Sequence, residues 1–358
     1  PSFYLQSGGT TGKNKIVGLN DRAVNYQGEN VAWILGDQYR YCKGSGMLGF
    51  LPMFHGFGLA MGVHAPLTNY ATSDLMATYN EKEIGKLIKA RKLRYLIVVP
   101  YLAKRMLKGK TLNDPSVSNL THAFIGADKT NPTVFTEFDS IMEKNNSKCR
   151  LLEGYGLTET VTVVVVNRIF DRKPGSVGKP FPDVKLKVID ENGNTLSTNQ
   201  NGQICISAPC LALGYLNDKE ATDKTFVTDE NGIRWVLTGD EGYIDEDGFL
   251  FIKGRIKDMF KIAGFNIFPA DIEDMTNKIE GVENCAAVYI DNPNHPYVHL
   301  FIKSDSKNID TSELVKRVRK NLSNELIKYA VPEKITVIDK LPLTNVGKIN
   351  KKKLIELD

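Results

Sequence analysis

The sequence predicts a mixed α/β protein with several domains. We expect a large N-terminal domain of mostly parallel α/β sheets with an antiparallel β subdomain, followed by a small α+β C-terminal domain. In the first part, short β-branched runs alternate with amphipathic helical stretches, which is typical of parallel sheets. After about residue 175, alternating strands joined by Asn/Gly turns replace them, which indicates antiparallel pairing.

Individual segments of the first part fit this fold. The stretch 81–92 has a helical period and precedes an apolar strand at 95–100. Segments 122–127 and 149–156 are each predicted as a strand that runs into a glycine turn. Because ligands of parallel α/β sheets bind beyond the carboxyl ends of the strands, the residues after these strands are site candidates.

The second part gives the domain boundaries. Strands at 184–196 and 202–209 and a hairpin with an Asp-Gly turn at 242–255 predict the β subdomain, at about 175–256. We place the core at 1–256 and the C-terminal domain at 257–358, with the boundary at Lys257, since about 100 residues can form a domain. The expected C-terminal elements are a helix (271–279), a strand pair (284–303), a long helix (311–329), a strand (334–339) and a basic tail.

Composition excludes several classes of protein. The net charge of +4 is spread without a basic stripe, so no nucleic-acid partner is expected. Five cysteines without a CxxC pair argue against a disulfide framework and for a reducing cytoplasm. The five histidines lack zinc-ligand spacing, and no apolar run reaches the ~18 residues of a membrane span. The chain opens on Pro1, which indicates processing or trimming.

Two glycine-rich stretches suggest phosphate binding. "SGGTTGKNK" (7–15) has the small and hydroxylated residues and lysines that can wrap a phosphate, but it lacks the spacing of a Walker A loop. "GSGMLG" (44–49) fits GxGxxG literally, yet no clear strand precedes it and no clear helix follows, so we expect its glycines to mark a turn. Taken alone, residues 7–15 fit a flexible tail or a surface turn equally well.

A third stretch, "EGYGLTET" (153–160), follows a predicted buried strand. There the ring of Tyr155 can stack on a base, the hydroxyl of Thr158 can meet a phosphate, and the carboxylate of Glu159 can bind Mg²⁺. The structural alternative is a strand-end turn with a satisfied carboxylate.

Three further stretches lie nearer the C-terminus. Within 237–258, Asp240 can accept from both ribose hydroxyls and Arg255 can clamp sugar or phosphate, although the two also fit a surface ion pair. "KIAGFNIFPADIE" (261–273) is a turn leading into a capped helix, and "LPLTNVGKINKKKL" (341–354) places a lysine on a glycine turn or in a solvated basic tail.

In their order, these stretches resemble the motifs of the adenylate-forming superfamily, which comprises acyl-CoA synthetases, peptide-synthetase adenylation domains and luciferases. Segment 7–15 looks like its phosphate loop, with Asn14 where the family usually has Pro. "PMFHGFG" (52–58) resembles its acyl-pocket segment, "IGA" (125–127) its adenine-edge loop, and "GQICISAPCLALGYLND" (202–218) its GELxxxGxxxxxGYxxx element. The chain looks most like a bacterial fatty-acid or aryl-acid–CoA ligase that lacks the usual N-terminal segment.

The resemblance implies a two-step reaction. ATP and a carboxylic acid give an acyl-adenylate and pyrophosphate, with Mg²⁺ as cofactor, and the thiol of CoA or of a carrier protein then displaces AMP. The implied roles are pyrophosphate binding (Thr10, Thr11, Gly12, Lys15), Mg²⁺ and phosphate contacts (Thr158, Glu159), adenine contacts (Gly126, Ala127, Tyr155, Gly156) and ribose binding (Asp240, Arg255).

The resemblance also implies that the small C-terminal domain is mobile and takes a different position in each of the two steps. Lys348 would bridge carboxylate and α-phosphate in the first step, Lys261 matches a motif used in the second, and Lys257 matches the hinge between them. Phe54, His55 and Val161 are acyl-pocket candidates. Because no charged residue stands out to bind an α-amine, a fatty or aryl acid is favoured. CoA is favoured over a carrier protein because no carrier domain follows Asp358. A stand-alone domain that loads a carrier protein and a truncated nucleotide-binding module without turnover remain alternatives, and the sequence does not give the oligomeric state.

Overall fold

The protein is described by a computed structural model. It describes residues 1–7, 15–36, 45–91, 93–109, 111–262, 265–292, 295–305, 310–343 and 349–358. Contacts between Cα atoms divide the chain into two compact units. The larger unit comprises 1–130, 134–238 and 242–252, and the smaller comprises 131–133, 239–241 and 253–358.

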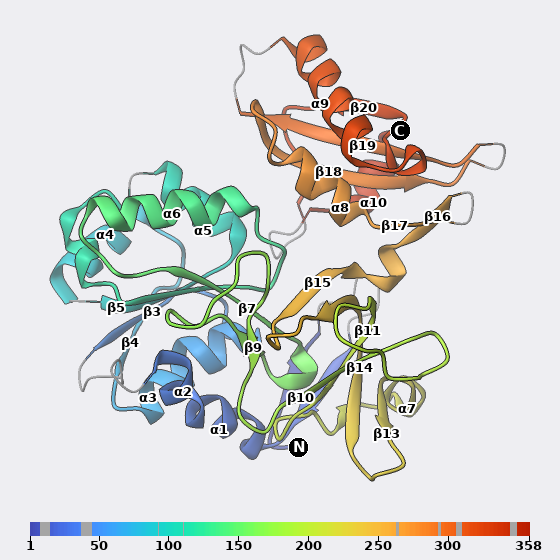
Figure 1. The fold of residues 1–358 in the computed structure, drawn as a ribbon. Helices are drawn as coiled ribbons and strands as arrows, with labels where there is room; N and C mark the ends of the chain where they lie inside the picture. Colours follow the sequence, from blue (N-terminus) through green and yellow to red (C-terminus); the bar gives the residue numbers. More distant parts are fainter. Residues whose placement is uncertain are drawn as a thin grey trace. The chain divides into compact units, whose positions relative to one another are not determined.

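A seven-stranded sheet forms the centre of the larger unit (Figure 1). Its strands lie in the order β4-β3-β5-β6-β7-β8-β9. Pairing is parallel from β4 to β7 and antiparallel from β7 to β9. The strands are β3 (Gly46–Gly49), β4 (Thr72–Leu75), β5 (Leu93–Val98), β6 (His122–Ile125), β7 (Leu151–Gly156), β8 (Val163–Val166) and β9 (Lys179–Pro180).

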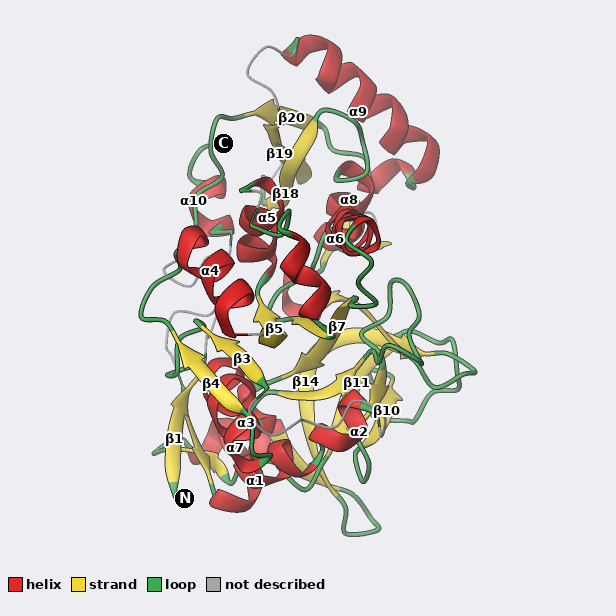
Figure 2. Ribbon diagram, turned by 90° about the vertical axis from the view of Figure 1, so that its left-hand side faces the viewer, coloured by secondary structure: helices red, strands yellow, loops and turns green. Residues whose placement is uncertain are grey.

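Helices cover both faces of this sheet (Figure 2). One face carries α4 (Glu81–Arg91), α5 (Pro100–Lys108) and α6 (Pro132–Lys144). The other carries α1 (Asp21–Glu29), α2 (Val31–Leu35), the π-helix η2 (Phe57–His64) and α3 (Ala65–Thr68). On α4, Ile84 and Ile88 lie one turn apart on the buried face, as the helical period predicts.

Two antiparallel sheets complete the larger unit. One has the order β10-β11-β14-β13, with β15 paired to β14. Strands β14 and β15 also contribute residues to the smaller unit. The other has the order β1-β2-β12. The elements are β1 (Phe3–Gln6), β2 (Ile16–Leu19), β10 (Lys185–Ile189), β11 (Gly202–Ser207), β12 (Gly214–Tyr215), α7 (Lys219–Thr225), β13 (Phe226–Thr228), β14 (Arg234–Ile244) and β15 (Leu250–Arg255).

The smaller unit has its own hydrophobic core between a three-stranded sheet and two helices. Leu314, Val318 and Leu322 form the buried stripe of α9, at the spacing of one helical turn. Its elements are η5 (Ile256–Asp258), the hairpin β16 (Phe260–Ile262) and β17 (Phe265–Ile267), α8 (Pro269–Thr276), β18 (Val282–Ile290), β19 (Tyr297–Ser304), α9 (Thr311–Glu325), η6 (Lys328–Ala330), β20 (Lys334–Val337) and α10 (Lys351–Ile355).

Three local predictions were wrong. Residues 46–49 form the buried strand β3 instead of a turn, and a Cβ on Gly46 would lie 2.5 Å from Leu93 Cδ2, so this glycine allows close packing. The end of the predicted basic tail forms α10, because Leu354 is buried in a small apolar cluster. The long helix ends at Glu325 instead of 329. In the described part of the chain, no helix is long and apolar enough to cross a membrane.

Candidate active site

The carboxyl ends of β6 and β7 place two of the predicted nucleotide segments side by side. The two strands are parallel neighbours in the sheet. Gly126 follows β6 at once, and a Cβ on it would lie 3.0 Å from the main-chain oxygen of Gly154. Ala127 has a φ of +71°, which residues other than glycine rarely adopt. The predicted adenine-edge loop therefore runs directly against the backbone that leads to Tyr155.

The turn after β7 is fixed from within. The 3₁₀ turn η4 (Thr158–Thr160) carries Glu159. The buried hydroxyl of Thr160 accepts from the main-chain N–H of Leu157 at 3.0 Å and donates to the carbonyl of Thr162 at 2.8 Å. This one side chain thus holds the backbone at Leu157 and at Thr162, on either side of Glu159. The fold therefore sets the position of Glu159.

The chain then reverses in a strained turn at Val161. Its φ and ψ are +67° and −58°, and the N–H of Thr162 donates to the carbonyl of Thr160 at 2.8 Å, which closes a three-residue γ-turn. A β-branched residue in this region costs about 1–3 kcal/mol, which packing must hold in place. Val161 is buried, so it lies inside the fold next to the proposed acyl-pocket segment.

That segment, 52–58, leads into the π-helix η2, a rare element that often occurs at functional sites. His55 Nδ1 accepts from the N–H of Phe57 at 3.2 Å, so this imidazole caps the start of the helix. Phe54 is 65% exposed. Gly56 lies against the Val161 turn, because a Cβ there would come within 1.7 Å of the Val161 carbonyl oxygen. The structure thus joins the 52–58 segment to the turn after β7.

Glu159 and Lys15 meet on one tyrosine of the β1-β2-β12 sheet. The hydroxyl of Tyr215 donates to Glu159 Oε1 at 2.6 Å, and Lys15 Nζ lies 4.3 Å from the centre of its ring. Burial, with a smaller effect of the neighbouring carboxylate, raises the pKa of Tyr215 above its ordinary value, so the phenol keeps its proton at neutral pH. The structure therefore links the carboxylate that the resemblance assigns to Mg²⁺ with the lysine that it assigns to pyrophosphate.

The strands β1 and β2 flank the predicted phosphate loop. They form an antiparallel hairpin, and the N–H of Ser7 donates to the carbonyl of Lys15 at 2.8 Å. Thr10, Thr11 and Gly12 lie outside the described residues, as does Lys348.

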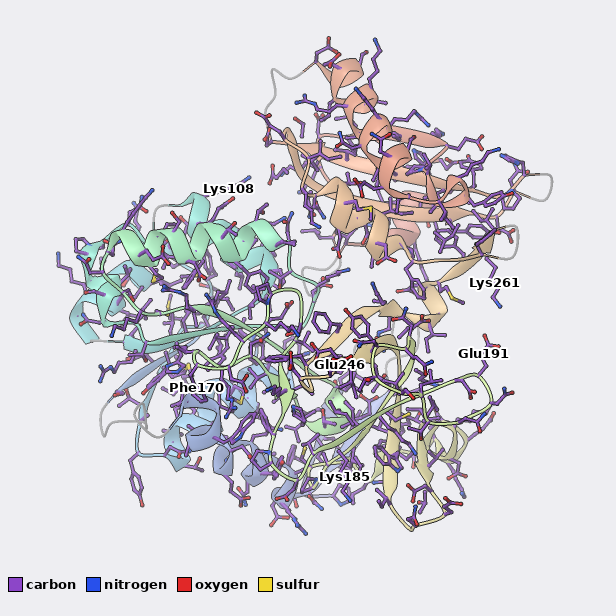
Figure 3. All side chains as sticks on the ribbon, in the orientation of Figure 1. Lys108, Phe170, Lys185, Glu191, Glu246 and Lys261 are labelled. Atoms are coloured by element: carbon purple, nitrogen blue, oxygen red, sulfur yellow. The ribbon has the colours of Figure 1, made fainter. Side chains whose placement is uncertain are left out.

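In the smaller unit, Asp240 and Arg255 form an ion pair. Arg255 Nε lies 2.9 Å from Asp240 Oδ1, and the aspartate side chain is 6% exposed. The two residues predicted to hold a ribose are thus brought together. Lys257 lies in η5, and Lys261 lies on β16 with its side chain exposed (Figure 3).

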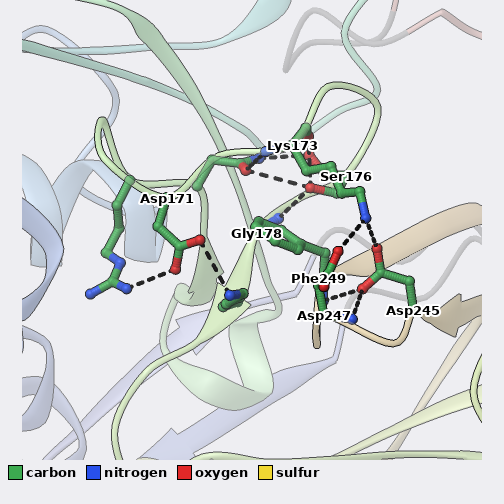
Figure 4. A network of polar contacts seen from close by, with 10 residues as sticks. Asp171, Lys173, Ser176, Gly178, Asp245, Asp247 and Phe249 are labelled. Carbon is green, nitrogen blue, oxygen red and sulfur yellow. Dashed lines mark hydrogen bonds and ion pairs between the residues drawn. The ribbon is translucent and has the colours of Figure 1, made fainter.

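A polar network ties the loop after β8 to the β14–β15 hairpin. Lys173 Nζ contacts Asp245 Oδ2 at 2.5 Å and Asp247 Oδ2 at 2.9 Å (Figure 4). These hydrogen bonds raise the pKa of Lys173. The N–H of Val177 also donates to the carbonyl of Leu250. The network belongs to the framework of the larger unit, because its contacts join the loop after β8 to the β14–β15 hairpin.

Sequence reasoning missed Tyr215, Thr160 and Gly56. Tyr215 was visible only as the last part of the GYxxx resemblance, and Gly56 only as part of the 52–58 segment. The contacts of Tyr215 and Gly56 join parts of the chain about 56 to 200 residues apart, so no local pattern predicts them.

Comparisons with known proteins identify the family. Residues 1–216 match the AMP-binding enzyme family, and residues 271–348 match the C-terminal domain of AMP-binding enzymes. Fold and sequence thus define an AMP-binding enzyme with a separate C-terminal domain. The chain belongs to the AMP-binding enzyme family, and the predicted resemblance to adenylate-forming enzymes is confirmed.

Individual relatives and solved structures are consistent with this family. The long-chain-fatty-acid–CoA ligase of Escherichia coli O157:H7 is 31% identical over 99% of this chain and 61% of its own length. The 4-coumarate–CoA ligase 1 of Narcissus pseudonarcissus is 29% identical over 97% of this chain and 63% of that protein. ATP-bound MatB from Rhodopseudomonas palustris superposes with a TM-score of 0.86 at 26% identity, over 99% of this chain and 67% of that one. The chain spans about three fifths of the length of the curated relatives, and the predicted mixed α/β fold is confirmed.

Proposed function

We propose that the protein activates a carboxylic acid with ATP to an acyl-adenylate, releases pyrophosphate and transfers the acyl group to the thiol of CoA. The observation that carries the proposal is the meeting of Glu159 and Lys15 on Tyr215, at the end of β7. A carboxylate that can face Mg²⁺ and a cation that can face phosphate are thereby held within one local arrangement. Family membership and the CoA ligases among the relatives support the reaction type.

For the nucleotide, we assign the adenine to the ends of β6 and β7. Tyr155 would stack on the base, while the backbone of Gly126, Ala127 and Gly156 would border it. A Cβ on Gly156 would come within 1.7 Å of the Thr162 carbonyl oxygen, so only glycine fits there. Asp240 and Arg255 would hold the ribose, with the arginine turning from the aspartate to sugar or phosphate when the hydroxyls arrive.

For the triphosphate, we assign Thr10, Thr11, Gly12 and Lys15 to the departing pyrophosphate and Thr158 to a phosphate contact. Glu159 fits a magnesium ion that ATP brings with it. Mg²⁺ takes one or two carboxylates together with substrate phosphates and water rather than a cage of protein ligands. Glu159 supplies one such carboxylate, and its Oε1 is held by the hydroxyl of Tyr215 at 2.6 Å. The ion would supply positive charge to the phosphates.

The chemical problem is the approach of two anions. A carboxylate oxygen attacks the α-phosphorus, the bond to the bridging oxygen breaks, and pyrophosphate leaves. Fixed cations lower the barrier by matching the charge that develops in the transition state. We assign Lys348 to the α-phosphate and the carboxylate as a point charge.

In the second step, the thiol sulfur attacks the acyl carbon and AMP leaves with the carboxylate oxygen. We propose that residues 257–358 turn about Lys257, so that the Lys348 segment serves adenylation and the Lys261 hairpin serves thioester formation. The exposed position of Lys257 in a single 3₁₀ turn between β15 and β16 supports a hinge there, since hinges are short segments between rigid elements.

The acid is proposed to be fatty or aryl. Phe54, His55 and Val161 would border it, and the π-helix η2 that follows is apolar over most of its length. A carrier-protein thiol in place of CoA, and nucleotide binding without turnover, are the alternatives. A reducing cytoplasm is the proposed location, because the sequence has five cysteines and no CxxC pair.

Pyrophosphate release tests the proposal. The chain is incubated with ATP and Mg²⁺ and a panel of fatty, aryl and amino acids, with and without CoA. We expect acid-dependent release that continues over many turnovers only when CoA is present. Release that is unaffected by CoA but enhanced by a phosphopantetheinylated carrier would favour the carrier alternative, and ATP binding without release would favour the binding module.

A further inference from the structure

We infer that Tyr215 is a positioning residue that orients the Glu159 carboxylate toward the magnesium of bound MgATP. This inference rests on the proposed function, because it takes Glu159 as the carboxylate that faces the metal. It adds a residue to which neither the motifs nor the family match assigns a role.

The hydrogen bond leaves one carboxylate oxygen for the ligand. Tyr215 donates to Oε1 of Glu159 at 2.6 Å. In the part of the chain that the structure describes, no hydrogen bond to Oε2 of Glu159 occurs. Since a metal-binding carboxylate needs its orientation fixed by an outer partner, a tyrosine on one oxygen directs the other.

The tyrosine is itself held in place. Tyr215 is 9% exposed, and its ring centre lies 5.9 Å from that of Phe226. Its N–H donates to Thr222 Oγ1 at 2.9 Å, which anchors β12 to α7. Because the backbone and the ring of Tyr215 are already held, its side chain loses little conformational entropy when it hydrogen-bonds to Glu159. It can therefore fix the orientation of the Glu159 carboxylate.

The backbone of Glu159 is tied to the same strand region. The N–H of Ala212 donates to the Glu159 carbonyl at 2.8 Å. Arg234 holds this loop, because its guanidinium donates to the carbonyls of Ala212 at 2.6 Å and Leu213 at 3.1 Å. The main chain and the carboxylate of Glu159 are therefore both hydrogen-bonded to the segment 212–215.

The ring of Tyr215 has a second role. Lys15 Nζ lies 4.3 Å above it, within the range of a cation–π contact. One side chain thus sets the spacing between a carboxylate for the metal and an ammonium group for phosphate. Tyr215→Phe removes only the hydrogen bond and keeps the ring, whereas Tyr215→Leu removes both, so the two roles can be separated.

The test titrates Mg²⁺ at fixed ATP and follows nucleotide binding by calorimetry or thermal stabilisation, without any turnover. We expect Tyr215→Phe to raise the half-saturating Mg²⁺ concentration about 10-fold, the lower end of what loss of an outer partner of a metal ligand produces. ATP binding in EDTA should be unchanged. Tyr215→Leu should also weaken binding in EDTA.

Two further variants separate positioning from folding. Phe226→Leu disturbs the packing behind Tyr215 and should lower the melting temperature without changing the half-saturating Mg²⁺ concentration. In a Glu159→Gln background, Tyr215→Phe should have no further effect on that concentration, because the two act as one unit.

The outcomes distinguish this inference from the proposed function. Mg²⁺-dependent ATP binding with an unchanged half-saturating concentration in Tyr215→Phe overturns the role of Tyr215 alone. An equal shift in Phe226→Leu also overturns it, because packing would then explain the effect. Absence of Mg²⁺-dependent ATP binding in the unmodified chain overturns both. A shift confined to the tyrosine variants, without pyrophosphate release from any acid, supports Tyr215 and overturns only turnover.

Discussion

The carbonyl oxygen of Val161 lies where a side chain on Gly56 would begin. A Cβ built on Gly56 would come within 1.7 Å of that oxygen and 2.8 Å of its carbon. Both contacts are with backbone, so no rotamer change relieves them. The γ-turn at Val161 directly follows the turn that carries Glu159. The segment proposed for the acyl group and the turn proposed for the metal are thus in direct contact.

Gly56→Ala should therefore destabilise the larger unit by about 3 kcal/mol, at the upper end of overpacking costs. Urea unfolding followed by tryptophan fluorescence measures this, because both tryptophans, Trp33 and Trp235, lie in the larger unit. Gly85→Ala is the matched control. A Cβ on Gly85 meets nothing within 4 Å, so alanine there should stabilise α4 by about 0.5–1 kcal/mol. Equal stability of Gly56→Ala and the unmodified chain would refute the close approach.

Burial of His122 makes the larger unit sensitive to acid. His122 lies on β6 next to Phe124, and burial, partly offset by the main chain of Leu35, lowers its pKa from 6.5 to about 4. The unfolded chain therefore binds more protons between these values. The stability that the neutral ring contributes is present above pH 6.5 and is lost as the pH falls toward 4.

In a comparison of pH 7 and pH 5, this group should account for about 2 kcal/mol of lost stability. His122→Gln removes the titrating group and should reduce the pH dependence of the free energy of unfolding by that amount. The same pH dependence in both proteins would mean that His122 is not buried in the neutral form.

Asp240 should recognise the ribose hydroxyls. A charge-assisted hydrogen bond contributes about 1.5–3 kcal/mol, which corresponds to roughly 10- to 100-fold in affinity. The unmodified chain should therefore bind ATP more tightly than 2′,3′-dideoxy-ATP by that factor, and Asp240→Ala should bind the two equally. Asp190→Ala, which changes an exposed turn carboxylate, is the control and should keep the preference. A preference retained in Asp240→Ala would place the ribose elsewhere.

The two half-reactions should respond to different variants. Lys348→Ala should slow adenylation about 10²–10³-fold, the effect of losing one preorganised donor, while thioester formation from a supplied acyl-adenylate persists. Lys257→Pro should spare adenylation and block thioester formation, because proline fixes the φ that a hinge must change.

Single-turnover assays of each half-reaction give these rates. Equal loss of both half-reactions in Lys348→Ala would contradict the assignment of this lysine to the first step. Normal thioester turnover in Lys257→Pro would contradict the hinge.

Patterns of short range were sufficient for much of the fold. Helix α4 and strand β5 were predictable because the apolar pattern that forms the buried face of each lies within one short stretch of sequence. The strand β3 was not, because Gly46 and Gly49 look like turn residues until sheet pairing with β4 and β5 buries them.

At the site, too, some contacts could be predicted from local sequence and others could not. Asp240 and Arg255 could be paired from sequence, since Asp240 lies just before the hairpin predicted at 242–255 and Arg255 lies at its end. The contacts of Tyr215 with Glu159 and Lys15 could not, because they depend on how three distant segments fold together. A motif names the residue types at a site but does not say which side chain orients which.

The central claim is that the carboxylate of the acid attacks the α-phosphorus of ATP. Its most direct test is mass spectrometry of the nucleotide product after turnover with an ¹⁸O-labelled acid, MgATP and CoA. If the acyl-adenylate forms, one carboxylate oxygen stays on phosphorus when the thiol displaces AMP, so we expect AMP carrying one ¹⁸O atom. Unlabelled AMP, or ADP as the product, would contradict the account.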